Sequence, residues 1–420
     1  MTRYDYRLTV ADALSAGKGD PRGNLRRVHE VVPGATLRGA LAALWWTQAD
    51  ANQADFVELF DRRLRVSQAV PDGWWLGSAA LKVCKYRSHD SLECATVQMD
   101  VAVYEAAGED LPYAYCWVCG GPLDTQGGWR RAASAPAVGL DRRTRSALAP
   151  DETAADAQLF VREQLSARDG SFVLTGSIDL DGSIDWLDGK TIRIGGGKSL
   201  DLGRAVITLT KSDAAPEPVT GMGVVRTLSP TILLDAYGGP VVTAQAWETE
   251  LRRVSGNDHL ALESRPDWLR TEVVTGFHTR SRLPKPVDWA VAPGSCAIVR
   301  GLQPGDAEAF THGVGYRTLE GYGAVEVSAP VVRVRPPEPE AVRRFNRLKQ
   351  EASRHWPQVA GIVRKSVEDV LAGKPRDQVI LAARTSLTRT PVGTGAQGML
   401  QGLLELSDAH LGELKQGGQP

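Results

Sequence analysis

The sequence has almost no net charge and no long apolar run. A formal net charge of -1 at pH 7 argues against a protein that coats nucleic acid through bulk charge, although it is compatible with a local basic groove. No apolar run approaches the length of a membrane-spanning helix, and the polar N-terminus, Thr2 to Arg7, does not resemble a signal peptide. We therefore expect a cytoplasmic protein, and 420 residues allow two or three domains.

The chain also lacks the common nucleotide-binding motifs. A Walker A loop ending in Gly197-Lys198-Ser199 would need a glycine at the position of Ile192. A dinucleotide-binding fingerprint would open a helix, whereas the residues from Arg204 to Thr210 are β-branched and predict a strand. We also find no catalytic triad and no metal-catalytic or nucleotide-hydrolysis group of residues in the sequence.

What the chain does have is a glycine-rich stretch from Ile192 to Val206. Gly195, Gly196 and Gly197 are free to adopt positive φ, and the N–H groups of such a turn can converge on an anion. Lys198 would add a charge beside them. The stretch predicts a phosphate-contacting loop between two strands, and the alternative is a glycine-rich hairpin without a ligand. The residues assigned to this loop are Gly195, Gly196, Gly197, Lys198 and Ser199.

A similar stretch recurs from Gly313 to Val327. Gly197 and Gly203 are spaced as Gly315 and Gly321 are, each pair encloses a basic residue, and a strand follows each. A pattern that appears twice in a long chain favours a duplicated domain. The candidate RNA-contacting residues of the second stretch are Gly313, Gly315, Tyr316, Arg317, Gly321 and Gly323.

A helix is predicted to begin near Ala35, after the turn at Pro33-Gly34, because leucines recur there at helical spacing. Arg38 lies in its first turns, and Gly39 would allow a close approach. Arg38 is either a surface arginine or a phosphate contact near a helix N-terminus, which favours anions.

Four of the five cysteines lie between Lys82 and Arg131. Cys116 and Cys119 have the two-residue spacing of a zinc knuckle, and clustered cysteines in a cytoplasmic protein favour metal over disulfides. We predict a structural zinc site, with His89 replacing Cys94 or Cys84 as the second choice and unligated thiols as the alternative. Its predicted ligands are Cys84, Cys94, Cys116 and Cys119.

The remaining pattern predicts strands over Ala157–Leu165 and Ser171–Leu180, a linker over 212–220, and a helix from about Ala246 to Arg253. Glu340 to Leu371 has helical periodicity with a basic face. Arginines cluster at three places, each a solvated face or part of a ligand site: Arg22, Arg26 and Arg27; Arg142, Arg143 and Arg145; Arg343, Arg344 and Arg347.

Three segments together resemble a known family. Val32 to Gly39 resembles the Pro-Gly-Ser-x-Leu-(Arg/Lys)-Gly opening of the RAMP superfamily of CRISPR-associated proteins, and the two glycine-rich stretches resemble its hallmark loop. Arg282 to Ser295 looks like part of the two-domain RAMP subunit of type III-D CRISPR effectors. The resemblance covers most of residues 1–335.

The resemblance implies an α+β fold of two ferredoxin-like (βαββαβ) domains with RNA lying across them. We assign residues 1–211 to the first domain, with the cysteine-rich insertion at 82–131, residues 221–335 to the second, and 336–420 to a helical extension. The implied function is binding of the 5′ handle of the guide crRNA. Its partners would be the guide, target RNA, and other RAMP and large subunits. Two further RNA contacts follow from the resemblance, Arg282 and Lys285.

Catalysis is the alternative, because some RAMP proteins cut RNA. Asp20 lies between the first strand and the first helix, where type III backbone subunits carry an aspartate, and could serve in cutting target RNA. His29 is the candidate for processing precursor guide RNA, as the general base for a 2′-OH. Asp20-Pro21 is also a common turn, and His29 a common surface residue. We expect a non-catalytic subunit.

Overall fold

A computed structural model describes residues 2–19, 25–85, 98–111, 122–132, 135–148, 154–168, 170–197, 202–213, 216–278, 281, 283–332, 340–352, 355–392, 394–408 and 411–412. The chain divides into two compact units. Unit 1 comprises Met1–Ala80 and Gly127–Pro330, and unit 2 comprises Leu81–Gln126 and Val331–Pro420. The protein is a mixed α and β structure with several sheets.

The N-terminal half of unit 1 is built on an antiparallel sheet with the strand order β14-β15-β1-β13-β4. Along the chain, strand β1 is followed by helix α1, strand β4, strand β13 and strand β15. The central strand β1 therefore has β13 on one side and β15 on the other. The bounds are β1 Thr2–Val10, α1 Gly34–Trp45, β4 Leu64–Val66, β5 Val70–Pro71, β13 Phe172–Leu180, β14 Thr191–Arg193 and β15 Arg204–Lys211.

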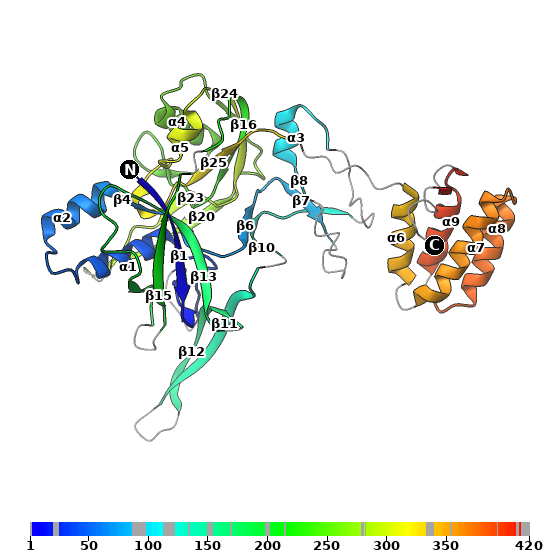
Figure 1. Ribbon diagram of the computed structural model, residues 1–420, viewed down its shortest axis with the longest axis horizontal. Coiled ribbons are helices and arrows are strands. Elements are labelled where there is room, and N and C mark those ends of the chain that lie inside the picture. Colours follow the sequence, from blue (N-terminus) through cyan, green and yellow to red (C-terminus); the bar gives the residue numbers. More distant parts are fainter. Residues whose placement is uncertain are drawn as a thin grey trace. The chain divides into compact units, whose positions relative to one another are not determined.

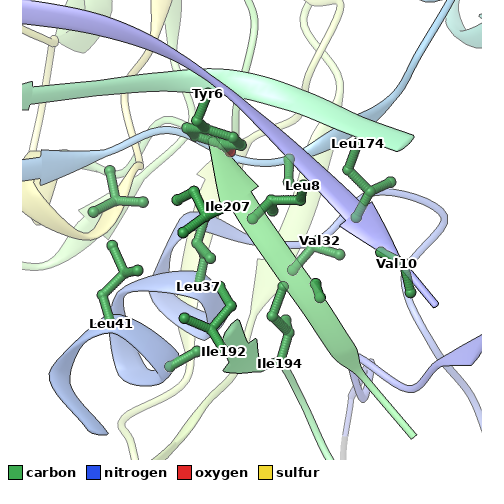
Figure 2. Close-up of a cluster of buried hydrophobic side chains, with 14 of the residues drawn as sticks. Tyr6, Leu8, Val10, Val32, Leu37, Leu41, Leu174, Ile192, Ile194 and Ile207 are labelled. Carbon is green, nitrogen blue, oxygen red and sulfur yellow. The ribbon is translucent and has the colours of Figure 1, made fainter. Parts of the chain in front are cut away.

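Alternation along β1 explains which face of this sheet is buried. Tyr6, Leu8 and Val10 are buried while the residues between them are exposed, as expected for a strand with one face on a core. Leu37 and Leu41 of α1 are buried at helical spacing and pack into the same cluster. Figure 2 shows side chains of β1, α1, β13, β14 and β15 meeting in this core.

The C-terminal half repeats this order with a complete strand-helix-strand-strand-helix-strand unit. Its sheet runs β19-β24-β16-β25, all antiparallel. Helix α4 begins where the Thr243 hydroxyl accepts a hydrogen bond from the Ala246 N–H (3.2 Å) and ends at Gly256. The bounds are β16 Gly221–Thr227, α4 Ala244–Ser255, β19 Ala261–Glu263, β24 Cys296–Leu302, α5 Asp306–Phe310 and β25 Val325–Ser328.

Each half carries a strand pair between the second and third strands of its sheet. In the N-terminal half this is the long pair of β11 (Val138–Leu148) and β12 (Ala154–Ala167), which β3 (Leu25–Arg26) and β2 (Ala13–Leu14) extend. Figure 1 shows β11 and β12 projecting as a two-stranded ribbon, which we call the arm. In the C-terminal half the pair is β20 (Thr271–Val274) and β23 (Asp288–Val291), continued by β21 (Phe277–His278) and β22 (Leu283–Pro284). The remaining pairs of unit 1 are β6 (Trp74–Gly77) with β10 (Gly128–Arg131) and β17 (Leu233–Leu234) with β18 (Pro240–Val241).

In the part of unit 2 that the structure describes, there is a small sheet with one short helix and a group of four further helices. The sheet joins β7 (Leu81–Cys84) to β8 (Gln98–Asp100) and β9 (Leu123–Thr125), with α3 over Val101–Ala107. The helices are α6 (Glu340–Ala352), α7 (Trp356–Leu371), α8 (Arg376–Thr388) and α9 (Thr394–Leu404), which share one apolar core. None of the described helices has the length and apolar character needed to cross a bilayer.

The observed elements match most of the sequence-based predictions. Helix α1 begins one residue before Ala35, α4 extends the predicted helix by two residues at each end, and strands cover Ala157–Leu165 and Ser171–Leu180 almost entirely. The stretch from Glu340 to Leu371, predicted to be helical, consists of the two helices α6 and α7. Pro357 lies in the first turn of α7, where a proline is tolerated because its missing N–H has no helical partner.

Candidate functional site

The first glycine-rich loop is closed against the segment that follows β1. The Ile194 N–H donates to the Gly203 carbonyl (2.8 Å), the Gly203 N–H to Ala13 (2.7 Å), and the Gly196 N–H to Ser15 (2.8 Å). A Cβ at Gly203 would lie 2.0 Å from the Ile194 carbonyl oxygen, and φ there is +75°. No side chain fits at position 203 beside the Ile194 carbonyl, so this close backbone contact requires glycine.

The second glycine-rich loop repeats this network residue for residue. The Val314 N–H donates to the Gly323 carbonyl (2.8 Å), the Gly323 N–H to Pro230 (2.9 Å), and the Tyr316 N–H to Ile232 (2.8 Å). A Cβ at Gly323 would lie 2.0 Å from the Val314 carbonyl oxygen. The two halves of unit 1 are therefore duplicated in their backbone contacts as well as in their strand order.

The hydrogen bonds align the two loops in a register that differs by two residues from the one that the glycine spacing predicts. The glycine spacing in the sequence paired Gly197 and Gly203 with Gly315 and Gly321, whereas the shared hydrogen bonds pair Gly203 with Gly323. In the same register Gly195 corresponds to Gly315, since a Cβ there would meet Ser15 O at 2.3 Å and Ile232 O at 2.4 Å respectively. Glycine spacing alone did not reveal the register, because several glycines in each loop have similar separations.

Most of the loop amides whose contacts are described point into the protein. The N–H groups of Gly196, Gly203, Tyr316 and Gly323 donate to carbonyls of the chain, and that of Gly315 donates to the Glu250 carboxylate (2.8 Å). An RNA phosphate would have to displace these acceptors. Lys198 and Ser199 lie outside the described residues, so phosphate binding by this loop stays a prediction.

Arg317, a predicted RNA contact, is held by two carboxylates. Its guanidinium pairs with Asp288 (2.8 Å) and Glu320 (2.9 Å) and lies over the Tyr322 ring at 4.9 Å. Burial alone would lower the pKa of this guanidinium, but hydrogen bonds and charge from Glu320, together with Asp288, raise the pKa above its usual value. The backbone at Arg317 has φ of 60°, the one positive φ at a non-glycine residue among those described. A phosphate at Arg317 would compete with both carboxylates.

Lys285 and Arg38 are also engaged within the chain. Lys285 Nζ lies 2.6 Å from Glu320, and Arg38 pairs with Asp61 (3.0 Å) and donates to the Phe60 carbonyl (2.5 Å). Burial would raise the pKa of Glu320, but hydrogen bonds from Arg317 and Lys285 lower it below the usual value. Tyr316, by contrast, is about half exposed, and Arg282 lies outside the described residues.

The RAMP-like segment from Val32 to Gly39 contacts the second glycine-rich loop directly. A Cβ at Gly34 would lie 2.7 Å from the Glu320 carbonyl oxygen and 2.9 Å from Gly321 Cα. A Cβ at Gly321 would lie 2.3 Å from the Val66 carbonyl oxygen. Gly313 is likewise close to Arg65, whose Nη2 would be 2.8 Å from an added Cβ. These glycines join the two halves of unit 1.

A cluster of arginines that sequence patterns only partly revealed lies on one face of the arm. In the strand register, Arg162 of β12 lies opposite Arg26 of β3 and opposite Arg143 of β11. Arg145 lies two residues further along β11. Arg162 also adjoins the first loop, since a Cβ at Gly197 would lie 3.0 Å from its Nη1 atom. Arg26 and Arg145 belonged to clusters visible in the sequence. Arg162 stands alone in its segment, and only the parallel pairing of β3 with β12 brings it to them.

The alternative catalytic residues and the predicted zinc ligands are only partly described. His29 is largely buried, which with the charge of Lys18 lowers its pKa to about 4, so the imidazole is neutral at pH 7. Cys84 is buried at the end of β7. Asp20, His89, Cys94, Cys116 and Cys119 lie outside the described residues. Within the described ranges, no three His, Cys, Asp or Glu residues gather as a metal site would require.

No protein-family model and no curated protein matches the chain. Solved structures do. A chain of a type III-B Cmr-beta complex bound to cognate target RNA is 13% identical at a TM-score of 0.39, with the match covering 70% of this chain and 86% of that one. Cmr4 (Cas7) from Pyrococcus furiosus is 10% identical at a TM-score of 0.23, covering 50% and 100%. A chain of a type IV-B CRISPR complex is 14% identical at 0.25, covering 52% and 95%.

At TM-scores this low the backbones superpose only in part. The proposed function therefore rests on the residues of this chain.

Proposed function

We propose that the chain is a non-catalytic, RNA-binding RAMP subunit of a type III CRISPR effector complex in the cytoplasm. The observation that carries this proposal is the duplication within unit 1. Both halves have the strand order of a ferredoxin-like domain, and both close a glycine-rich loop through the same three hydrogen bonds. The RAMP resemblance implies two such domains. In this chain the second loop also packs on the Pro-Gly-x-x-Leu-Arg-Gly segment.

The type III-D assignment and binding of the guide's 5′ handle are the finer parts of the proposal. They are supported by the resemblance of Arg282 to Ser295 to the two-domain subunit of those effectors. A complex that must accept any guide sequence needs contacts to phosphates, because these position a strand without specifying its bases. Other RAMP subunits and a large subunit are the proposed protein partners.

A structural zinc site in the cysteine-rich segment is also proposed. Cys84 at the end of β7 would be one ligand, and a thiolate can bind zinc from a buried position because the metal compensates its charge. Four protein ligands would stabilise the fold and leave no open position for chemistry.

The proposal includes no catalytic role. A histidine with a pKa of about 4 is a weak base and is not protonated at neutral pH, so the surroundings of His29 favour structure over acid–base catalysis. Asp20 lies outside the described residues, so a catalytic role for it has to be tested by mutation. If guide processing and target cleavage are unchanged in complexes carrying Asp20→Ala and His29→Ala, the proposal of a non-catalytic subunit stands.

The decisive experiment is to purify the complex containing this chain and to sequence the RNA that accompanies it. We expect guide RNAs with a constant 5′ segment, and ribonuclease footprinting should place this chain at that segment. RNA without a constant 5′ segment, or a footprint that omits this chain, would contradict the proposal.

A further inference from the structure

We propose that Arg26, Arg145 and Arg162 form a binding site for the phosphodiester backbone of single-stranded RNA on one face of the arm. The inference rests on the proposed function, because it assumes that the chain binds RNA. It assigns the binding to residues other than the loop glycines and the ion-paired cations described above.

The three side chains belong to one surface because of strand register. Residues directly opposite each other in paired strands project to the same face, and neighbouring strands are about 4.8 Å apart. Arg26 and Arg162 are such a pair in β3 and β12. Arg143 lies opposite Arg162 on β11, and Arg145 shares its face because side chains alternate along a strand. A row of guanidinium groups therefore crosses three strands.

Three of the four arginines of this row have no carboxylate partner within the described part of the chain. Arg143 has a partner, Asp141, at 3.2 Å, but no carboxylate there pairs with Arg26, Arg145 or Arg162. The Nη1 atom of Arg162 is enclosed and has no hydrogen-bond partner. Burial, and then the positive charges of Arg26 and Arg145, lower the pKa of Arg162. On the opposite face, Arg142 is paired with Glu163 at 3.0 Å.

Like charges placed directly opposite each other destabilise a sheet, so the free protein is strained electrostatically where these arginines meet. An anion that binds them removes this repulsion. Guanidinium groups bind phosphate oxygens through paired N–H donors, and Gly197 beside Arg162 has no side chain to block the approach. Phe160, opposite Arg145, is the one aromatic residue paired with the row. The site is therefore suited to phosphates more than to stacked bases, and binding there would not depend on the nucleotide sequence of the RNA.

The test is the salt dependence of RNA binding by the full-length protein. The variant carries Arg26→Gln, Arg145→Gln and Arg162→Gln. The control carries Arg142→Gln, Arg253→Gln and Arg300→Gln, which remove the same charge from exposed arginines that are already paired with carboxylates. The probe is a mixed-sequence, single-stranded RNA oligonucleotide. Thermal unfolding establishes that both proteins are folded.

We expect the slope of log K against log salt to fall by about 0.7 for each phosphate that is no longer bound, or about 2 for the triple variant, with the control unchanged. If the parent binds RNA and the two variants have the same slope, the inference is overturned while the proposed function stands. Failure of the parent protein to bind the RNA at any salt concentration would overturn both. Loss of binding to an acidic partner subunit, with RNA binding intact, would assign the arginine row to a protein interface and overturn the inference.

Discussion

Gly34 and Gly321 lie against each other where the two halves of unit 1 meet, and a Cβ at Gly34 would be 2.9 Å from Gly321 Cα. Gly321 also has φ of +85° and is close to the Val66 carbonyl. An alanine at 321 would therefore add backbone strain to a steric overlap with main-chain atoms. We expect Gly321→Ala to lower the free energy of unfolding by about 2–3 kcal/mol, measured by urea denaturation.

Gly39 is the matched control, because it belongs to the same RAMP-like segment but a Cβ added there would have no atom within 4 Å. It lies within α1, where alanine is favoured over glycine. Gly39→Ala should leave stability unchanged or raise it by up to about 1 kcal/mol. Equal losses in the two variants would show that helix α1, and not the junction between the halves, is sensitive to substitution.

The fold was predictable where the signals were local. Alternation located β12 and β13, and leucine spacing located α1, since each pattern reflects which side of the element is buried. The strand order and the glycine register were not predictable in the same way. Gly203 and Gly323 are equivalent because of backbone atoms that they contact, and those contacts involve residues far away in the sequence.

The candidate site was predicted less well for a related reason. Arg317 is a natural candidate for phosphate binding when only its glycine neighbours are known. Its partner Asp288 is 29 residues away, and nothing in the sequence pattern joins the two. Arg162 and Arg26 are brought together by parallel pairing of β12 with β3, which is equally invisible in the sequence. The sequence identified a basic, glycine-rich region, and the strand pairing decides which of its cations face one another.

Replacing Arg317 with alanine should destabilise the protein, because it leaves Asp288 and Glu320 partly buried without their shared partner. We expect a loss of about 3 kcal/mol at pH 7, with the same loss in guide-free protein, as a structural ion pair requires. The lowered pKa of Glu320 adds a pH signature. Its contribution is present above the unfolded-state pKa and is lost as the pH falls through the folded-state pKa.

Parent protein should therefore lose stability on acidification below about pH 4.5, where an unfolded glutamate begins to protonate, more steeply than Arg317→Ala does. Arg300→Ala is the control, since it removes an exposed arginine paired with Glu263. A parallel pH dependence in the parent and in Arg317→Ala would contradict this account of Glu320.

His29 should make the protein sensitive to mild acid. Its folded-state pKa of about 4 lies below the unfolded value of 6.5, so the neutral imidazole is favoured by folding. The resulting stability is complete above pH 6.5 and declines as the pH falls toward 4, by about 3 kcal/mol over the interval. Urea unfolding between pH 7 and pH 4 should show this decline in the parent and a flatter profile in His29→Gln. The exposed His278 supplies the control, and His278→Gln should follow the parent.

Zinc analysis tests the cysteine cluster. We expect about one zinc ion per chain after purification without added metal, and its loss in a Cys116→Ser, Cys119→Ser variant. Because a structural zinc stabilises the fold that holds it, chelation should lower the melting temperature of the parent and not that of the variant. The control is Cys296→Ser, since this buried thiol lies on β24 of unit 1. Substoichiometric zinc in carefully purified parent protein would rule out the four-thiolate site.

Arg162→Gln should stabilise the RNA-free protein, which distinguishes a binding residue from a structural one. Removing the central charge of the row relieves its repulsion with Arg26 and Arg145, and we expect a gain of about 0.5–1 kcal/mol at low salt. Added salt screens the repulsion in the parent, so the gain should shrink as ionic strength rises. If Arg162 instead supports the arm through contacts of its own, the variant will be less stable at every salt concentration. Urea unfolding of both proteins across a salt series separates these outcomes, because salt screens repulsion between like charges and leaves packing contacts of the arm unchanged.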